Sequence, residues 1–198
     1  MRAPRGAAWP AVSITEDTLA YFRGDTEFRN YVMLELPHHT GVVPAAGGTR
    51  DWSVTIVRSF LYSALMVLVW DALEKSSDRD LAAIAAKSLK EARYHLHHAI
   101  DWVVKFGDGT AESHERAQSA LEHLFRYTEE FWTPSEFEDA AIATGAAVDV
   151  RTLRAGWDAI VADTLARATL KRPEVRGYIP EGKNGRHSEH LSYLLGEM

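Results

Sequence analysis

The chain has 198 residues, of which 46% are hydrophobic and 25% charged, proportions typical of one globular domain and not of a disordered chain. Its net charge of −6 disfavours a surface for duplex nucleic acid, because neutralising phosphates requires clustered Lys and Arg. Cysteine is absent, which excludes disulfides, thiolate metal sites and thiol nucleophiles and fits a cytoplasmic location.

The first residues contain Arg2 and Arg5 but no apolar run as long as that of a signal peptide, so secretion is disfavoured. The region before Asp51 is only weakly periodic, and short helices are expected at residues 16–23 and 27–36.

A strongly apolar stretch, Ser53 to Trp70, has nearly the length of a membrane-spanning helix. Arg58 lies inside it among several hydroxyl side chains, and a charged residue facing lipid would be costly. We therefore interpret the stretch as the buried centre of a helical bundle and expect no membrane span.

Glycine and proline divide the rest of the chain into helical blocks. The first helix is expected from Asp51, a good N-cap, to about Lys75. The second is expected from Arg79 to Phe106, ending where Gly107 and Gly109 adopt the left-handed conformation. Because the turn between these two helices is short, they are expected to be antiparallel neighbours.

The third block, Ser113 to Trp132, has a Ser at its start and ends before Pro134. Shorter helices are predicted at 134–144 and, capped by Asp149, at 149–170. Residues 171–186 are expected to be a loop, and residues 187–198 the start of another helix. No block has the sustained alternation of a strand, so the predicted fold class is all-α. The apolar positions of the third block have helical spacing: Ala117, Ala120, Leu121, Leu124 and Phe125.

Glu91-Ala-Arg-Tyr94 resembles the Glu-x-x-His ligand pair of a ferritin-like di-iron site, with tyrosine in place of histidine. His95 follows within the apolar stripe of the second helix, one turn after Glu91. The pair is either the remnant of a metal site or a core histidine bonded to Glu91. We favour the second reading, because residues four apart commonly contact on a helix.

Two other patterns are weaker. His187 and His190 stand three residues apart, a spacing that can bind metal, but without a third ligand we interpret them as a helix start packed on a neighbour. Trp102 and Trp157 lie on helical blocks and are candidates for structural or interface anchors. No catalytic, cofactor-binding or complete metal set is predicted in this chain.

Three stretches resemble the C-type subunits of the bacterial phenylacetyl-CoA epoxidases. They are residues 82–98 (AAIAAKSLKEARYHLHH), 148–157 (VDVRTLRAGW) and 185–191 (GRHSEHL). The resemblance covers residues 16–198, which would form one ferritin-like domain, incomplete at both ends and lacking the family's first helices. Residues 1–15 match nothing in that family and are expected to be disordered.

The resemblance implies a degenerate ferritin-like bundle without its own di-iron site, acting as a non-catalytic structural subunit in aerobic phenylacetate catabolism. The implied partners are the catalytic A subunit, which would hold the di-iron centre, the small B subunit, and a reductase with FAD, an iron-sulfur cluster and NADPH. Two alternatives stay open: a stand-alone ferritin-like di-iron oxygenase, and a helical interaction protein with no oxygenase partner.

Overall fold

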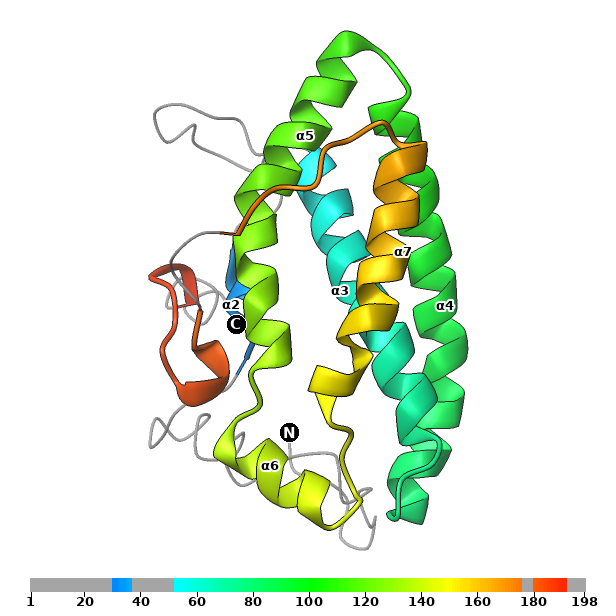
Figure 1. Ribbon diagram of the computed structural model, residues 1–198, viewed down its shortest axis with the longest axis vertical. Coiled ribbons are helices and arrows are strands. Elements are labelled where there is room, and N and C mark those ends of the chain that lie inside the picture. The colour runs from blue at the N-terminus through cyan, green and yellow to red at the C-terminus, as the bar shows by residue number, and fades with distance from the viewer. Residues whose placement is uncertain (1–29, 37–51, 176–179, 192–198) are drawn as a thin grey trace, which may run out of the picture.

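The computed structural model describes residues 30–36, 52–175 and 180–191. Within them, α3 packs against α4, α5 and α7, and α4 also contacts α5 and α7, so these four helices form one bundle (Figure 1). The only β-type pairing in the described residues is one isolated bridge between Glu181 and Arg186, which confirms the all-α prediction. The long helices are α3 (Trp52–Leu73), α4 (Arg79–Gly107), α5 (Ala111–Phe125) and α7 (Arg154–Arg167). The short ones are α2 (Val32–Glu35) and α6 (Glu136–Ala143), with 3₁₀ turns η1 (Arg126–Trp132), η2 (Val150–Leu153) and η3 (Gly182–Asn184).

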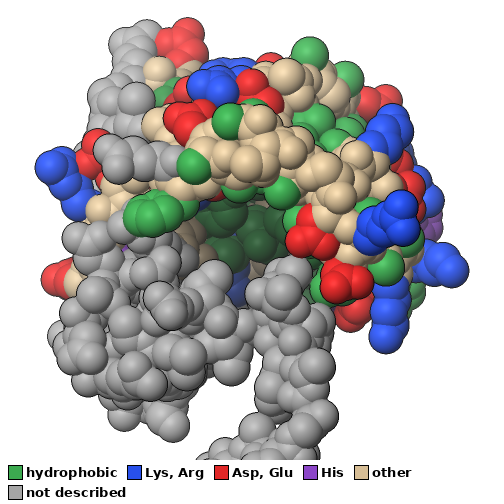
Figure 2. All heavy atoms as spheres, turned by 90° about the horizontal axis from the view of Figure 1, so that it is seen from below, with side chains coloured by type: hydrophobic (Ala, Val, Ile, Leu, Met, Phe, Trp, Pro, Cys, Tyr) green, Lys and Arg blue, Asp and Glu red, His purple; other side chains and the backbone are tan. Residues whose placement is uncertain are grey.

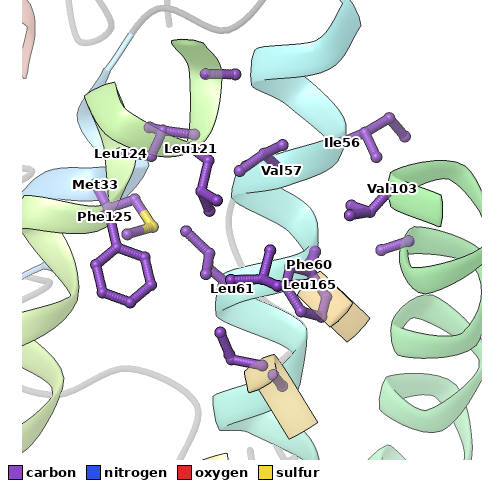
Figure 3. Close-up of a cluster of buried hydrophobic side chains, with 14 of the residues drawn as sticks. Met33, Ile56, Val57, Phe60, Leu61, Val103, Leu121, Leu124, Phe125 and Leu165 are labelled. Atoms are coloured by element: carbon purple, nitrogen blue, oxygen red, sulfur yellow. The ribbon is translucent and has the colours of Figure 1, made fainter. Parts of the chain in front are cut away.

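The core lies around α3, the most apolar of the helices. Val57, Phe60 and Leu61 of this helix are fully buried and face Leu121 and Leu124 of α5 and Leu165 of α7 (Figure 3). All five apolar positions predicted for the face of α5 are buried. The helical spacing of those residues therefore identified the buried side of α5 correctly.

The helix α3 is also long and apolar enough, at a mean hydropathy of 1.6, to cross a membrane by length and composition. Half of its most apolar 18-residue stretch is buried inside the protein. Core helices of globular proteins pass the same test, and the packing of α3 against three other helices is the bundle-centre position predicted from the sequence.

Several helix ends follow the sequence signals. Asp78 caps α4 by accepting hydrogen bonds from the backbone N–H groups of Asp80 and Leu81. Ser135 and Glu138 form a capping box at the start of α6, and Gly145 after that helix has a φ of +76°. Asp149 accepts from the N–H of Arg151, although the chain first makes the 3₁₀ turn η2 before α7 begins.

Other ends differ from the prediction. The cap of α5 is Thr110 and not Ser113, whose hydroxyl instead donates to the carbonyl of Phe106 at the end of α4 (2.8 Å). The third block is α-helical only to Phe125 and then tightens into η1, where the Thr128 hydroxyl donates to the Phe125 carbonyl (2.7 Å). The helix expected at 149–170 ends at Arg167.

The expected left-handed glycines at the end of α4 are also wrong, since neither Gly107 nor Gly109 has a positive φ. Gly107 is needed for space: a Cβ there would lie 2.0 Å from the carbonyl oxygen of Ala168. The predicted cap at Asp51, the helix at 16–23, the N-terminal segment 1–15 and most of the helix at 187–198 lie outside the described residues.

Candidate functional site

The ligand-like residues of α4 lie on its outer surface. Tyr94 is 68% exposed, and the side chains of Glu91 and His95 are 77% and 55% exposed. His95 Nε2 lies 3.6 Å from Glu91 Oε1, so the predicted contact within the helix is present. The prediction that His95 belongs to the core is wrong, because the buried stripe of α4 runs through Leu89 and leaves His95 at its rim.

The facing helix α3 offers no carboxylate to Glu91. Ser63 in the middle of α3 is buried, and the acidic Asp71 near the helix end pairs with Arg93 of α4 at 3.1 Å. Among the residues that the structure describes, no three His, Asp or Glu side chains gather in a way that could hold a metal ion. The residues at these positions therefore do not fit a di-iron centre, which needs carboxylates from several helices.

The two tryptophan candidates have different environments. Trp157 is 1% exposed at the start of α7, and its indole N–H donates to the carbonyl of Leu61 in α3 (3.0 Å). Trp102 is only half-buried on α4, where its N–H donates to His98 Nε2 (3.2 Å) and Lys105 lies over its ring. Trp157 is thus an anchor of the chain's own core, whereas Trp102 is accessible to a partner.

The His187 pattern leads to a buried carboxylate that sequence reasoning missed. His187 Nδ1 lies 2.6 Å from Oε1 of Glu35, a fully buried residue of α2. Oε2 of the same carboxylate accepts from the backbone N–H (2.8 Å) and the hydroxyl (2.9 Å) of Ser188. His190 is half-buried and helical, so only the first histidine of the predicted pair reaches the carboxylate.

A second buried carboxylate, Glu130 of η1, has a similar arrangement. Its Oε2 accepts from the N–H of Val32 in α2 (2.9 Å), and its Oε1 accepts from the N–H of Lys183 (3.0 Å). A hydrogen bond from the Gly182 backbone adds to these. Glu130 therefore joins three segments that are far apart in the sequence.

The side chain of Lys183 closes this cluster. Its ammonium group lies 3.1 Å from Glu138 Oε2 of α6 and over the ring of Tyr31. Burial, and next the nearby charge of Glu138, raise the pKa of Tyr31. The buried polar groups of this region are thus matched donor to acceptor, which is what burial of charge requires.

One sequence signal could have indicated the first of these carboxylates. Glu35 stands in a short apolar stretch, VMLEL, and a carboxylate flanked by core residues must find donors when it is buried. Glu130 follows another acidic residue, Glu129, and carries no such signal. The donors themselves could not be identified from the sequence, because Glu35 and His187 are 152 residues apart.

The buried Glu130 gives the chain a specific pH dependence. Burial raises its pKa above the ordinary 4.5, and the backbone hydrogen bonds from Val32 and Lys183 oppose that rise only in part. With a raised folded-state pKa, the stabilisation from protonated Glu130 is present below the unfolded pKa and is lost as the pH rises through the folded value. We expect wild-type stability to fall relative to Glu130→Gln as the pH rises through this window.

Urea unfolding of both chains between about pH 4 and about pH 7 measures this difference. Glu129→Gln is the matched control, since the neighbouring Glu129 is partly exposed and pairs with Arg154 at 2.8 Å. Stability curves of wild type and Glu130→Gln that stay parallel across the whole range would contradict the expectation.

The surface carries mixed charge. Acidic and basic side chains are interspersed over the described part of the face in Figure 2. Arg151 pairs with Asp139 and Asp149, and Arg172 pairs with Asp158. On these described residues the cations lie beside anions, which does not favour a phosphate-binding surface.

Comparison with known proteins gives two matches. Residues 8–198 match the family described as phenylacetic acid catabolic protein. The chain is also 40% identical over 183 residues to the C subunit of the 1,2-phenylacetyl-CoA epoxidase of Escherichia coli (strain K12). That alignment covers 92% of this chain and 69% of the relative. Both matches confirm the resemblance found in the three sequence stretches, and the helical architecture agrees with the all-α, ferritin-like fold that it implies.

Proposed function

This chain belongs to the family of phenylacetic acid catabolic proteins, and we propose that it is the non-catalytic C-type subunit of a 1,2-phenylacetyl-CoA epoxidase. The observation that carries the proposal is the 40% identity, over nearly the whole chain, to a protein named as that component of the epoxidase. In this role the chain supplies scaffold and interface, while a di-iron A subunit performs the epoxidation.

The non-catalytic role is supported by the residues at the ligand-like positions. Tyr94 stands where a Glu-x-x-His pair would have its histidine, and Ser63 occupies the middle of the facing helix. The buried carboxylates Glu35 and Glu130 accept hydrogen bonds from backbone and side-chain donors of the chain itself. A structural role is therefore sufficient to explain these two buried carboxylates, and no catalytic role is needed.

Pairing with an A subunit is supported by the surface of α3 and α4. The second half of α3 is apolar and only partly covered, from Met66 to Trp70. On α4, Tyr94 is exposed and Trp102 is half-buried, and large aromatic side chains of this kind are typical anchors of protein interfaces. The further components of the proposal, a small B subunit and a reductase with FAD, an iron-sulfur cluster and NADPH, rest on the family resemblance alone. The proposed cytoplasmic location rests on that resemblance and on the absence of cysteine.

The test is co-expression with the A subunit of the same pathway, followed by size-exclusion chromatography and iron analysis. We expect one complex in which iron follows the A subunit, and little iron on this chain alone. About two irons per isolated chain would instead support the stand-alone di-iron oxygenase. A chain that forms no complex with the A subunit would support a helical protein without an oxygenase partner.

The double variant Glu91→Ala/His95→Ala tests the non-catalytic role. Both side chains are exposed, so the fold should be unaffected, and epoxidation per assembled complex is expected to stay within about twofold of wild type. The matched control is Lys87→Ala/Lys90→Ala on the same helix. An assembled complex that holds normal iron but loses turnover by about 100-fold, or about 2.7 kcal/mol in barrier, would place this chain in the chemistry.

A further inference from the structure

Residues 180–191, here called the clasp, lie beside α2 and outside the helical bundle (Figure 1). The clasp contains the short turn η3, the bridge between Glu181 and Arg186, and the first helical residues His190 and Leu191. The printed sequence places it more than 140 residues after α2. Its bonds to α2, η1 and α6 are tertiary contacts that help to hold it in place.

The first attachment point of the clasp is Glu35. The donors to its two oxygens are His187 Nδ1, Ser188 N–H and the Ser188 hydroxyl, and all three belong to the clasp. A buried carboxylate is costly unless its oxygens accept hydrogen bonds. The clasp therefore supplies the donors that the buried Glu35 carboxylate needs. Glu35 in turn supplies the acceptor oxygens that hold the clasp.

The second attachment point of the clasp is Glu130. It accepts at one oxygen from Val32 of α2 and at the other from Lys183 of the clasp. Gly182 fits this close approach because it has no side chain: a Cβ there would lie 2.1 Å from the Asn30 carbonyl oxygen and 3.1 Å from Glu130 Oε1. One carboxylate of η1 therefore holds both α2 and the clasp.

We propose that the clasp opens as one conformational unit without unfolding the bundle, and that Glu35 of α2 and Glu130 of η1 are its two coupled attachment points. Two features separate it from the bundle. The clasp is fixed by polar bonds to α2, η1 and α6, and its buried apolar side chains are Pro180 and Leu191. The bundle is fixed by apolar packing of α3 against α4, α5 and α7. Segments with few buried apolar contacts open at lower free energy than the core does.

The consequence is that the clasp can detach from α2 and η1 while α2 and the four long helices stay packed in the core. Opening would uncover the carboxylate of Glu35, which is buried in the closed state. The inference does not depend on the proposed oxygenase role, because it concerns the chain by itself.

Residue-resolved hydrogen exchange of the full chain tests the coupling. In Glu35→Gln, the amide of Ser188 loses its carboxylate acceptor, and we expect its exchange to accelerate by about tenfold or more. The amide of Lys183, which bonds to Glu130, should accelerate by a similar factor. The amide of Val32 should keep its protection, because α2 stays packed in the core. Amides in the middle of α3 and α4, such as Leu61 and Ala92, should keep their protection. The reciprocal Glu130→Gln should deprotect Ser188.

Glu181→Gln is the matched control, because Glu181 lies in the clasp but its partner Arg186 is exposed. It should leave all of these rates unchanged. Loss of protection at Ser188 alone, with Lys183 unchanged, would overturn the coupling. Equal loss in α3 and α4, or a Glu35→Gln chain without helical circular dichroism, would overturn the separate opening.

Discussion

Trp157→Ala is expected to lower the free energy of unfolding by about 4 kcal/mol, the range for removing a buried aromatic side chain. Trp157 is 1% exposed, and its ring lies 5.5 Å from that of Trp132 and 5.9 Å from that of Phe125. The substitution leaves a cavity between α3, α5 and α7 and removes the hydrogen bond from the indole N–H to the Leu61 carbonyl. Few substitutions in the described chain remove as much packing.

Urea unfolding followed by far-UV circular dichroism measures the effect. Trp102→Ala is the matched control, and we expect it to cost less than half as much, because Trp102 is only half-buried. Trp157→Phe separates the packing from the hydrogen bond to Leu61, since it keeps most of the ring. A Trp157→Ala chain as stable as the Trp102→Ala chain would contradict the assigned core position.

The same comparison bears on the proposed complex. If the chain pairs with an A subunit, Trp157→Ala should reduce complex formation through loss of fold, whereas Trp102→Ala should reduce it while the chain stays folded. Thermal unfolding of each variant, measured beside its recovery in co-purification, distinguishes the two causes.

The helices are predictable because local signals decide them. A continuous apolar run identifies α3, and periodic apolar residues identify α4 and α5. Gly145 and Asp149 mark helix ends because their chemistry acts within one turn. The misassigned start of α5 has a local cause too: Thr110 and Ser113 are both good caps, and the Ser113 hydroxyl donates to the carbonyl of Phe106 at the end of the preceding helix.

The polar cluster is not predictable, because its partners come together only in the fold. The sequence indicates His187 as a candidate, but its acceptor Glu35 lies on a short helix at the other end of the chain. His95 shows the opposite error. A helical wheel alone places it in the core, whereas the neighbours of α4 determine which part of an apolar stripe is covered.

Gly107 is another position where only the fold explains the residue. It ends α4 against the end of α7, where its carbonyl accepts from the Thr169 hydroxyl (3.3 Å) and lies 2.8 Å from His114 Nδ1. Thr169 itself has a φ of +57°, a conformation that costs free energy for a β-branched residue. The two helix ends therefore meet at a contact with little room for adjustment.

Gly107→Ala is accordingly expected to destabilise the chain by about 3 kcal/mol, at the upper end for overpacking. The added Cβ would lie 2.0 Å from the Ala168 carbonyl oxygen, a backbone atom that cannot rotate away. Gly156→Ala is the matched control: it lies in the first turn of α7, and its Cβ would meet Leu68 at an ordinary 3.4 Å. Since alanine is the better helix former, Gly156→Ala should stabilise by about 0.5 kcal/mol. Urea unfolding of both variants should thus give shifts of opposite sign, and a Gly107→Ala chain as stable as Gly156→Ala would show that α4 and α7 do not meet as closely as described.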